Sequence, residues 1–359
     1  MRNLELLTSE KLLAIRSPEA LFSCSKIDAK QEYRALARRW HPDRDDSPTA
    51  QRVFAHIADL YHGAVKKLRD GSWTEPAEKV DEETPGVKRF RLKDGSVKAI
   101  EYLSMRPFEL GTMLISNDSV IFEVSNQFVD LFREAMVRIK KLSFVNNDMA
   151  AQMGPWLPQI EDVFTTCESK IVVLRKTPDQ LLLADVLKHM GGRLDPIEHV
   201  GWILNVLLNL ACYLEWSGTT HNAIALDTIF VSPLRHSGML LGGWWYSAYV
   251  GQRLRALPDR SFHIIPCDIL MNKCADGTAD LELIKALGRE LLGASDAGRA
   301  PGSFDETIPQ PIQEWLQMPS SGSATIDYAQ WKNEVLPAAF GRPKFVKLNL
   351  ASADLYKEK

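Results

Sequence analysis

The stretch that most restricts the fold of this chain is "ALARRWHPDRDD" (35–46), in which a proline interrupts a strongly helical pattern. Residues 27–40 have the spacing of an amphipathic helix, and Asp28 is placed to cap its N-terminus. Pro42 must end this helix, because its ring clashes with the preceding turn and it has no N–H to donate. A second helical pattern covers 47–71. The sequence therefore predicts a helical hairpin with the segment around Pro42 at its tip.

The two predicted helices have distinct apolar and charged faces. In the first helix the apolar side chains recur at i, i+3, i+4 and i+7, and they are Tyr33, Leu36, Ala37 and Trp40. Its cations lie on another face and are Lys30, Arg34 and Arg38, with Arg39 beside them. The apolar face of the second helix consists of Val53, Phe54, Ile57, Leu60, Tyr61, Ala64 and Leu68. We expect the apolar faces to pack together and the cations to remain in solvent.

The run "YRALARRWHPD", followed by "VFAHIADLYHGAV", resembles the J domain of DnaJ-like co-chaperones. That family has a Tyr, a basic residue, Leu-Ala, a second basic residue, an aromatic residue, His-Pro-Asp, and later Phe-x-x-Ile-x-x-x-Tyr. The matching residues here are Tyr33, Arg34, Leu36, Ala37, Arg39, Trp40, His41, Pro42, Asp43, Phe54, Ile57 and Tyr61. The resemblance covers about 17–70. It departs from the family at "SPEALFSCSK", which is a short version of the usual opening helix.

The resemblance implies that the protein stimulates ATP hydrolysis by a DnaK-type chaperone of the heat-shock 70 family. The cationic face would steer the domain onto an acidic surface of the chaperone. Asp43, held rigid by Pro42, would offer its carboxylate to an arginine of the chaperone, and His41 would orient the loop or donate a hydrogen bond to the partner. The implied chaperone-binding residues are Lys30, Arg34, Arg38, Arg39, His41, Pro42 and Asp43.

Composition limits the other classes of function. The chain has 359 residues, of which 45% are hydrophobic and 25% charged, so it is long enough for two or three domains with their own cores. Its net charge of −3 argues against nucleic acid or a lipid surface as the main partner. The most apolar run, 200–216, contains Asn205, Asn209 and Glu215, which favours a buried helix over a membrane span.

The number and spacing of the cysteines indicate the redox compartment in which the protein occurs. There are five, at positions 24, 167, 212, 267 and 274, and no two of them form a CxxC pair. An odd number without paired spacing is typical of free thiols in a reducing compartment, so a cytoplasmic location is expected.

The chain divides at an acidic, Pro-containing segment. "GSWTEPAEKVDEETPG" (71–86) contains five acids and one lysine and reads as a solvated linker that would let the flanking modules move independently. Strand-like runs follow it, and long helical patterns begin near 179. This order predicts an α+β fold: an all-helical domain, then a two-lobed domain. The expected parts are a J domain at 1–70, the linker at 71–86, a small β-rich lobe at 87–178, a large helical lobe at 179–345 and a tail at 346–359.

Residues 87–345 resemble a protein kinase in the order of their elements. "EWSGTTHNAIALDTIFVSP" (215–233) and "GMLLGGWWYSAYVG" (238–251) resemble the catalytic segment, in which a loop histidine lies between a buried helix and two short strands. "DLELIKALGRELLG" (280–293) resembles a later buried helix that starts with an aspartate. "SVIFEVS" (119–125) would be the third strand of the small lobe, and 126–142 the helix packed on its sheet.

The catalytic residues of that family are missing. His221 matches the loop histidine, and Glu134 matches the helix glutamate without its ion-pair partner. The phosphate-binding lysine corresponds to Glu123, the catalytic aspartate to Ala223, its helping lysine to Ala225, the metal-binding asparagine to Thr228, and the second metal ligand to Gly242 or Gly243. Phosphoryl transfer depends on these cations, metal ligands and the base. The resemblance therefore implies a catalytically inactive, pseudokinase domain with no cofactor and no metal, serving as a scaffold for a protein client or partner.

Two alternatives remain open from the sequence. The second domain could be an atypical kinase-like enzyme that binds nucleotide through unfamiliar residues, or the chain could bind nucleic acid through the basic helix and "RFRLK" (89–93). The aromatic cluster "GGWWYSAY" (242–249) could stack bases or fill a vacated nucleotide cleft, although such clusters are usually core. His56 and His62 have no cysteine or carboxylate arranged around them and are not expected to bind metal.

Overall fold

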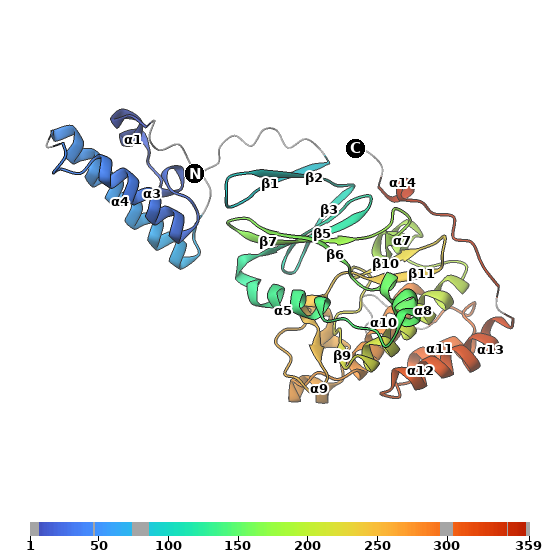
Figure 1. The fold of residues 1–359 in the computed structure, drawn as a ribbon. Helices are drawn as coiled ribbons and strands as arrows, with labels where there is room; N and C mark the ends of the chain where they lie inside the picture. The colour runs from blue at the N-terminus through green and yellow to red at the C-terminus, as the bar shows by residue number, and fades with distance from the viewer. Residues whose placement is uncertain (1–6, 46, 74–85, 295–303, 343, 357–359) are drawn as a thin grey trace. The chain divides into compact units, whose positions relative to one another are not determined.

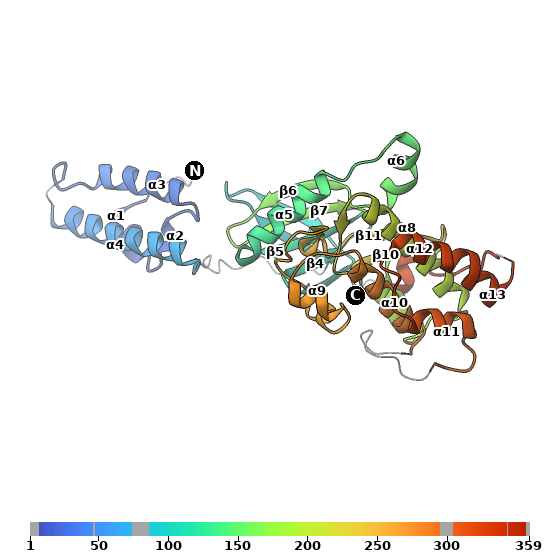
Figure 2. The same ribbon diagram turned by 90° about the horizontal axis from the view of Figure 1, so that it is seen from below.

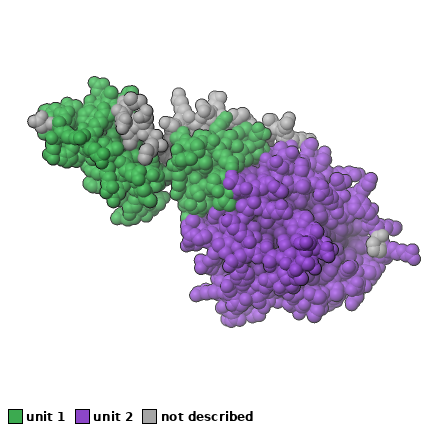
Figure 3. Space-filling view, in the orientation of Figure 1, with its two compact units in different colours: residues 1–102, 123–127, 163–172 green, residues 103–122, 128–162, 173–359 purple. Residues whose placement is uncertain are grey.

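The computed structural model of the chain describes residues 7–45, 47–73, 86–294, 304–342 and 344–356. Helices and β-sheets are both present, as Figure 1 and the view from below in Figure 2 show, so the fold is α+β. The chain forms two compact units, which Figure 3 colours separately. The first unit comprises 1–102, 123–127 and 163–172, and the second comprises 103–122, 128–162 and 173–359.

The first unit begins with four helices, α1 (Ser9–Ala14), α2 (Pro18–Leu21), α3 (Lys26–Arg39) and α4 (Pro48–Asp70). Ser25 caps α3, since its Oγ accepts a hydrogen bond from the backbone N–H of Asp28 at 3.4 Å. The prediction that Asp28 is the cap was wrong, and Asp28 lies in the first turn. Ser47 caps α4 in the same way, and Gly71 ends it with a φ of 70°. The two long helices lie side by side in Figures 1 and 2.

The helices share one apolar core, as the faces of α3 and α4 predicted. The rings of Tyr33 and Tyr61 stack with centroids 4.3 Å apart and an angle of 12°, which fixes the register of α3 against α4. Trp73, the third residue of the predicted linker, is also part of this core. The remainder of the linker, 74–85, lies outside the described residues. The fully or nearly fully buried members of the core include Leu12, Leu21, Phe22, Leu36, Val53, Ile57, Leu60 and Ala64.

Cys24, which precedes α3, forms a disulfide with Cys167. The expectation that all five cysteines are free thiols was therefore wrong for these two. Their sequence separation of 143 residues hides the pairing from any local pattern. Cys167 also packs against the helical core. The bond provides a covalent link in addition to the chain itself and therefore opposes the independent motion expected from the acidic linker.

The strands form one five-stranded sheet and three smaller ones. The large sheet has the order β3 (Ser104–Phe108), β4 (Gly111–Ile115), β5 (Ser119–Ser125), β7 (Ser169–Arg175) and β6 (Ile160–Thr165). β3 and β4 are antiparallel, with Ser104 opposite Ile115 and Phe108 opposite Gly111. The hairpin of β1 (Val87–Arg91) and β2 (Val97–Glu101) stands apart from this sheet in the pairing pattern. These strands confirm that strands follow the predicted linker.

The expected helix over 126–142 is present in the second unit as α5 (Val129–Lys140), after a short 3-10 turn at Asn126–Phe128. In the sequence, α5 and α6 (Asn147–Met153) lie between β5 and β6. Its buried residues are Phe132, Ala135, Met136, Arg138 and Ile139.

The larger part of the second unit is helical and is built around α8 (Glu198–Trp216), the predicted buried helix. α7 (Leu183–His189) precedes it, and α10 (Thr278–Leu291) packs against it. Gly288 of α10 permits this packing, because an added Cβ would lie 3.0 Å from Leu204 and 2.7 Å from Leu316. The other helices are α9 (Cys267–Asn272), α11 (Gln310–Gln317), α12 (Ala324–Gln330), α13 (Leu336–Phe340) and α14 (Ser352–Leu355), with a π-helical turn at Trp331–Val335.

Short strands connect these helices. β10 (Ile229–Ser232) and β11 (Ser237–Leu240) are the two strands expected after the loop histidine, and they pair antiparallel with Ile229 opposite Leu240. β8 (Leu181–Leu182) completes their sheet, and β9 (Thr219–Thr220) pairs with β12 (Ala248–Tyr249). At the C-terminal end, the hydroxyl of Tyr356 donates a hydrogen bond to Asp185 at 2.8 Å. None of the described helices has the length and apolarity needed to cross a bilayer.

Candidate functional site

The tip of the first unit is held in shape by His41. Its Nδ1 accepts a hydrogen bond from the backbone N–H of Asp43 at 3.2 Å. The imidazole ring meets Phe54 of α4 edge-on, with centroids 5.4 Å apart. His41 is therefore fixed by the second helix and in turn fixes the backbone of the loop, which is the orienting role expected for it.

The carboxylate at the tip faces solvent. The side chain of Asp43 is 87% exposed, and that of His41 46%. α3 ends at Arg39, and Arg44 closes the turn by donating through Nη1 to the carbonyl of Arg38 at 3.4 Å. Pro42 is half-buried between the two helix ends. A visiting molecule can thus reach Asp43 without any rearrangement of the tip.

The cations predicted to flank the tip are exposed. Within the described chain, no ion pair engages Lys30, Arg34 or Arg38. The guanidinium of Arg39 lies over the ring of Trp40, 5.2 Å from its centroid. α3 therefore presents a basic, solvated surface beside an exposed carboxylate, a combination that suits an acidic partner containing an arginine.

The second unit contains the loop matched to a kinase catalytic segment, and a buried carboxylate anchors it. Asp280, in the first turn of α10, accepts the backbone N–H of His221 through Oδ2 and that of Asn222 through Oδ1, both at 2.7 Å. Burial raises the pKa of Asp280 to about 7, while the two hydrogen bonds act in the opposite direction. Asn222 has a φ of 62°, which the side-chain amide supports by donating to Thr220 Oγ1 and to the carbonyl of Tyr246, both at 2.9 Å.

His221 is a structural residue in this loop. Its side chain is completely buried, and its Nε2 lies 2.9 Å from the carbonyl oxygen of Gly242. Burial lowers the pKa of His221 to about 3, so the ring is neutral near pH 7. A neutral ring that donates from Nε2 has no proton on Nδ1, and Nδ1 is buried without a partner.

The positions matched to catalytic groups hold no groups that could replace them. Ala223 and Ala225 are buried, and Thr228 closes the loop by donating to the carbonyl of Ala223 at 2.9 Å. Gly242 and Gly243 have no room for a side chain. A Cβ on Gly242 would lie 3.0 Å from Thr228 Cα, and one on Gly243 would lie 2.7 Å from the His221 ring.

The two glutamates matched to kinase positions have other partners. Glu123 forms an ion pair with Lys88 and accepts a hydrogen bond from Ser169 at 3.1 Å. Glu134 forms an ion pair with Arg255 at 2.8 Å. The strand position that would hold its partner in a kinase is Glu123, as predicted from the sequence, and Glu134 pairs instead with a cation from the segment after β12.

Aromatic rings from the 242–249 cluster pack against β3 and β5. Trp245 lies 5.6 Å from Phe108 and 5.0 Å from Phe122 between ring centroids. The turn after β3 is held down by Glu109, which accepts hydrogen bonds from the hydroxyl of Tyr246 and, at 3.2 Å, from the backbone N–H of Asp259. Trp244, Trp245 and Tyr246 of the cluster at 242–249 are buried, which agrees with the interpretation as core, whereas Tyr249 is half-buried.

Comparison with known protein families and curated proteins found no similar protein. Among the described residues, no group of three or more His, Cys, Asp or Glu side chains could hold a metal ion. His56 instead bonds through Nε2 to the carbonyl of Ile15 at 2.8 Å.

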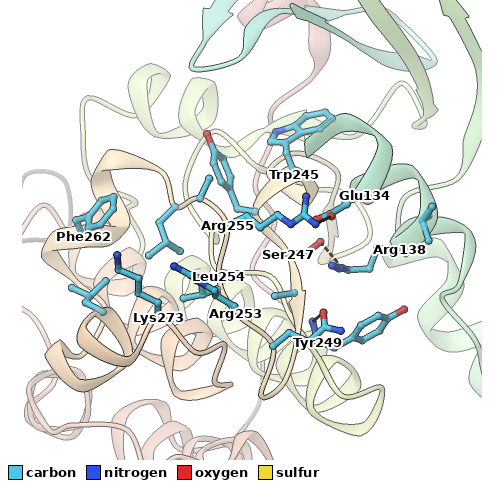
Figure 4. A pocket seen from close by; sticks show the side chains of 17 residues that line it. Glu134, Arg138, Trp245, Ser247, Tyr249, Arg253, Leu254, Arg255, Phe262 and Lys273 are labelled. Carbon is cyan, nitrogen blue, oxygen red and sulfur yellow. Dashed lines mark hydrogen bonds and ion pairs between the residues drawn. The ribbon is translucent and has the colours of Figure 1, made fainter. Parts of the chain in front are cut away.

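A further feature, a cavity beside α5, was not predicted from the sequence. It is lined by Glu134 and Arg138 of that helix and by residues 245–273 (Figure 4). The only hint in the sequence was the recurrence of basic residues at Arg253, Arg255 and Lys273, which have no regular spacing.

Proposed function

We propose that this protein is a J-domain co-chaperone that docks on a DnaK-type chaperone and stimulates its ATPase. In the proposal, residues 1–70 are the J domain and the kinase-like second domain is a catalytically inactive scaffold that binds a client or partner protein. The observation that carries the proposal is the exposed carboxylate of Asp43, held by His41 beside a solvated cationic helix. No chemical step occurs on this chain, and the effect on the chaperone is one of linkage, because the J domain binds one chaperone state better than another.

The tip supports docking by its charge and its rigidity. Asp43 can receive a charge-assisted, bidentate contact from a partner arginine. Lys30, Arg34 and Arg38 supply attraction at longer range, and this raises the association rate more than the final affinity. Because Pro42 and His41 fix the loop before binding, little conformational entropy is lost when the partner arrives.

The packing in this region supports the inactive scaffold over the kinase-like enzyme. If the second domain is kinase-like, its nucleotide site would coincide with the hydrogen bonds of Glu109 and with the aromatic rings packed around Trp245. Ala223 and Ala225 offer neither a base nor a cation. We therefore infer a role in binding for the second domain.

A cytoplasmic location is part of this proposal, because the DnaK-type chaperone that would bind the tip is expected in that compartment. In a reducing compartment, a disulfide forms only transiently or under oxidation. The Cys24–Cys167 bond would then report the oxidised form of the protein.

The proposal is tested by binding of the full chain to an immobilised DnaK-type chaperone at several salt concentrations. We expect an association rate that falls as ionic strength rises, and a smaller dependence for Arg34→Gln/Arg38→Gln. A matched control is Arg342→Gln/Lys344→Gln, which removes the same charge from exposed positions of the second unit. Equal salt dependence in the two double variants would overturn steering by α3.

A further inference from the structure

The cavity beside α5 has a volume of about 1090 Å³. All of its lining residues belong to the second unit. A volume of this size is at the upper end for pockets that take small molecules or short peptide segments. Figure 4 shows Glu134 and Arg138 of α5 on one side, with Leu254, Lys273 and Phe262 on the other.

Arg138 is a buried cation without a carboxylate bonded to it. Its residue is 92% buried, being only 8% exposed, yet it lines the cavity. Nε donates to Ser247 Oγ at 3.3 Å, and the guanidinium carbon lies 4.8 Å from the centroid of the Tyr249 ring. Within the described chain, no acceptor is bonded to its two terminal nitrogens. The hydrogen bond and ring contact of Arg138 are made to neutral groups, Glu134 acts on it through charge alone, and the end of its guanidinium remains available.

Further cations line the same cavity from the opposite segment. The backbone N–H of Leu254 donates to the carbonyl of Lys273 at 2.8 Å, and Arg253 pairs with Cys274 in a β-bridge. These contacts hold Arg253 and Lys273 on two adjacent segments of the chain. Neither has an ion-pair partner among the described residues. The single carboxylate of the lining, Glu134, is engaged by Arg255 at 2.8 Å.

The cavity therefore has an excess of three cations, because its one carboxylate, Glu134, is paired with a fourth cation, Arg255. A carboxylate monoanion needs only one such partner, whereas a phosphate monoester carries close to two negative charges and three acceptor oxygens. The forked guanidinium of Arg138 suits paired phosphate oxygens, and Lys273 suits a single one. The charge of the cavity thus fits a phosphate group better than a carboxylate.

The cavity also has an apolar part. Val137, Leu254, Leu257 and Phe262 line it, and the side chains of Val137 and Phe262 are 49% and 52% exposed. Exposed apolar side chains at the rim of a charged cavity favour a ligand with an apolar body attached to its anionic group. Inorganic phosphate alone would leave this surface uncovered.

We propose that this cavity binds a phosphate monoester carried on an apolar body, with Arg138, Arg253 and Lys273 contacting the phosphate oxygens. Such a group can come from a phosphorylated side chain of a partner protein or from a small phosphorylated molecule. The proposal deepens the partner-binding role assigned above to the second domain and rests on it. It makes no use of the tip of the first unit, so its test needs no chaperone.

The test is isothermal titration of the full chain with four probes. They are phenyl phosphate, inorganic phosphate, phenylacetate, and a Leu-Leu-phosphotyrosine-Leu-Leu peptide with its unphosphorylated form as control. We expect phenyl phosphate to bind about tenfold more tightly than inorganic phosphate, because the ring covers apolar surface, and about tenfold more tightly than phenylacetate, because of the second charge. Tighter binding of the phosphopeptide than of phenyl phosphate identifies a protein source, and the reverse identifies a small molecule.

Two double variants decide whether the cavity is the site. Arg253→Gln/Lys273→Gln changes exposed rim residues and should weaken phenyl phosphate binding by about tenfold or more. Arg342→Gln/Lys344→Gln removes the same net charge from exposed residues outside the cavity and should leave the affinity unchanged. The proposal is overturned if both double variants bind equally, or if neither phosphorylated probe binds at millimolar concentration.

Discussion

Oδ2 of Asp280 accepts the backbone N–H of His221 at 2.7 Å, joining two residues that are 59 positions apart in the chain. Both residues are buried, and the carboxylate therefore acts as the anchor of the loop that carries His221. The same carboxylate holds the next backbone N–H through its other oxygen, so a single side chain fixes two consecutive peptide groups. This geometry fixes the loop although the positions after it, 223–226, hold only apolar side chains.

Replacement of Asp280 by asparagine should destabilise the second unit. The amide retains one acceptor oxygen but turns a donor toward one of the two backbone N–H groups, which is then buried without a partner. A loss of about 1–3 kcal/mol in the free energy of unfolding is expected. Urea denaturation measures it, with Asp268→Asn on exposed α9 as the control that should change little. Equal stabilities for the two variants would show that the anchor contributes nothing.

Introduction of a side chain at Gly243 should be costlier than at Gly251. Both glycines have a φ near 80°, and a Cβ at Gly251 would have no atom within 4 Å. Gly251→Ala therefore measures only the free-energy cost of placing an alanine in the left-handed backbone conformation, about 1–2 kcal/mol. Gly243→Ala adds a contact of 2.7 Å with the His221 ring, for which we expect a further ~1–3 kcal/mol. Chemical denaturation of the two variants measures the difference. An equal cost at both positions would mean that the site matched to a kinase metal ligand has room for a side chain.

Stability should fall below neutral pH in part because of His236. Its ring stacks on Trp202, with centroids 4.6 Å apart, and burial lowers the pKa of both His236 and the neighbouring His199. Since the unfolded imidazole binds a proton near its ordinary pKa of 6.5, the unfolded state takes up protons first as pH falls from 7 to 5, and the free energy of unfolding drops.

The comparison of wild type with His236→Gln isolates that contribution. The raised pKa of Asp280 acts with the opposite sign over part of this range, but equally in both proteins. Urea midpoints at pH 7 and pH 5 should differ less in the variant than in wild type. An identical pH dependence would mean that His236 takes up its proton as readily in the folded protein as in the unfolded chain.

Excess ATP with magnesium should not raise the melting temperature of the protein. A ligand present at a hundred times its dissociation constant stabilises by about 2.7 kcal/mol, which is readily visible in a thermal scan. The positions matched to the phosphate-binding lysine and to the metal ligands are Glu123, Thr228 and Gly242 or Gly243, which supply neither a cation nor a carboxylate for magnesium at those places. A stabilisation that requires both ATP and magnesium would favour the atypical enzyme instead.

The sequence predicted the elements that depend on local pattern. The apolar spacing of α3 and α4, the helix-ending effect of Pro42 and the continuous apolar run of α8 are properties of short windows, and each was confirmed. The position of Asp43 on the surface followed from the same reasoning, because a tip between two packed helices has nothing to cover it.

Pairings between distant segments could not be predicted in this way. The partner of Glu134 is Arg255, which tertiary packing brings to it from a later segment. The Cys24–Cys167 bond is similarly remote, and the capping of α3 by Ser25 was missed because Asp28 is an equally acceptable cap by residue type. The cavity around Arg138 was invisible because its lining comes from segments with no common periodicity.

The most direct test of the central claim is steady-state ATP hydrolysis by a DnaK-type chaperone in the presence of wild-type protein, Asp43→Asn and Asp59→Asn. Asp59 is an exposed carboxylate on α4 and serves as the matched control. The account predicts stimulation by wild type and by Asp59→Asn, and loss of at least about nine-tenths of it in Asp43→Asn, since a charged hydrogen bond is worth about 1.5–3 kcal/mol. Equal stimulation by Asp43→Asn and wild type would contradict docking through the tip.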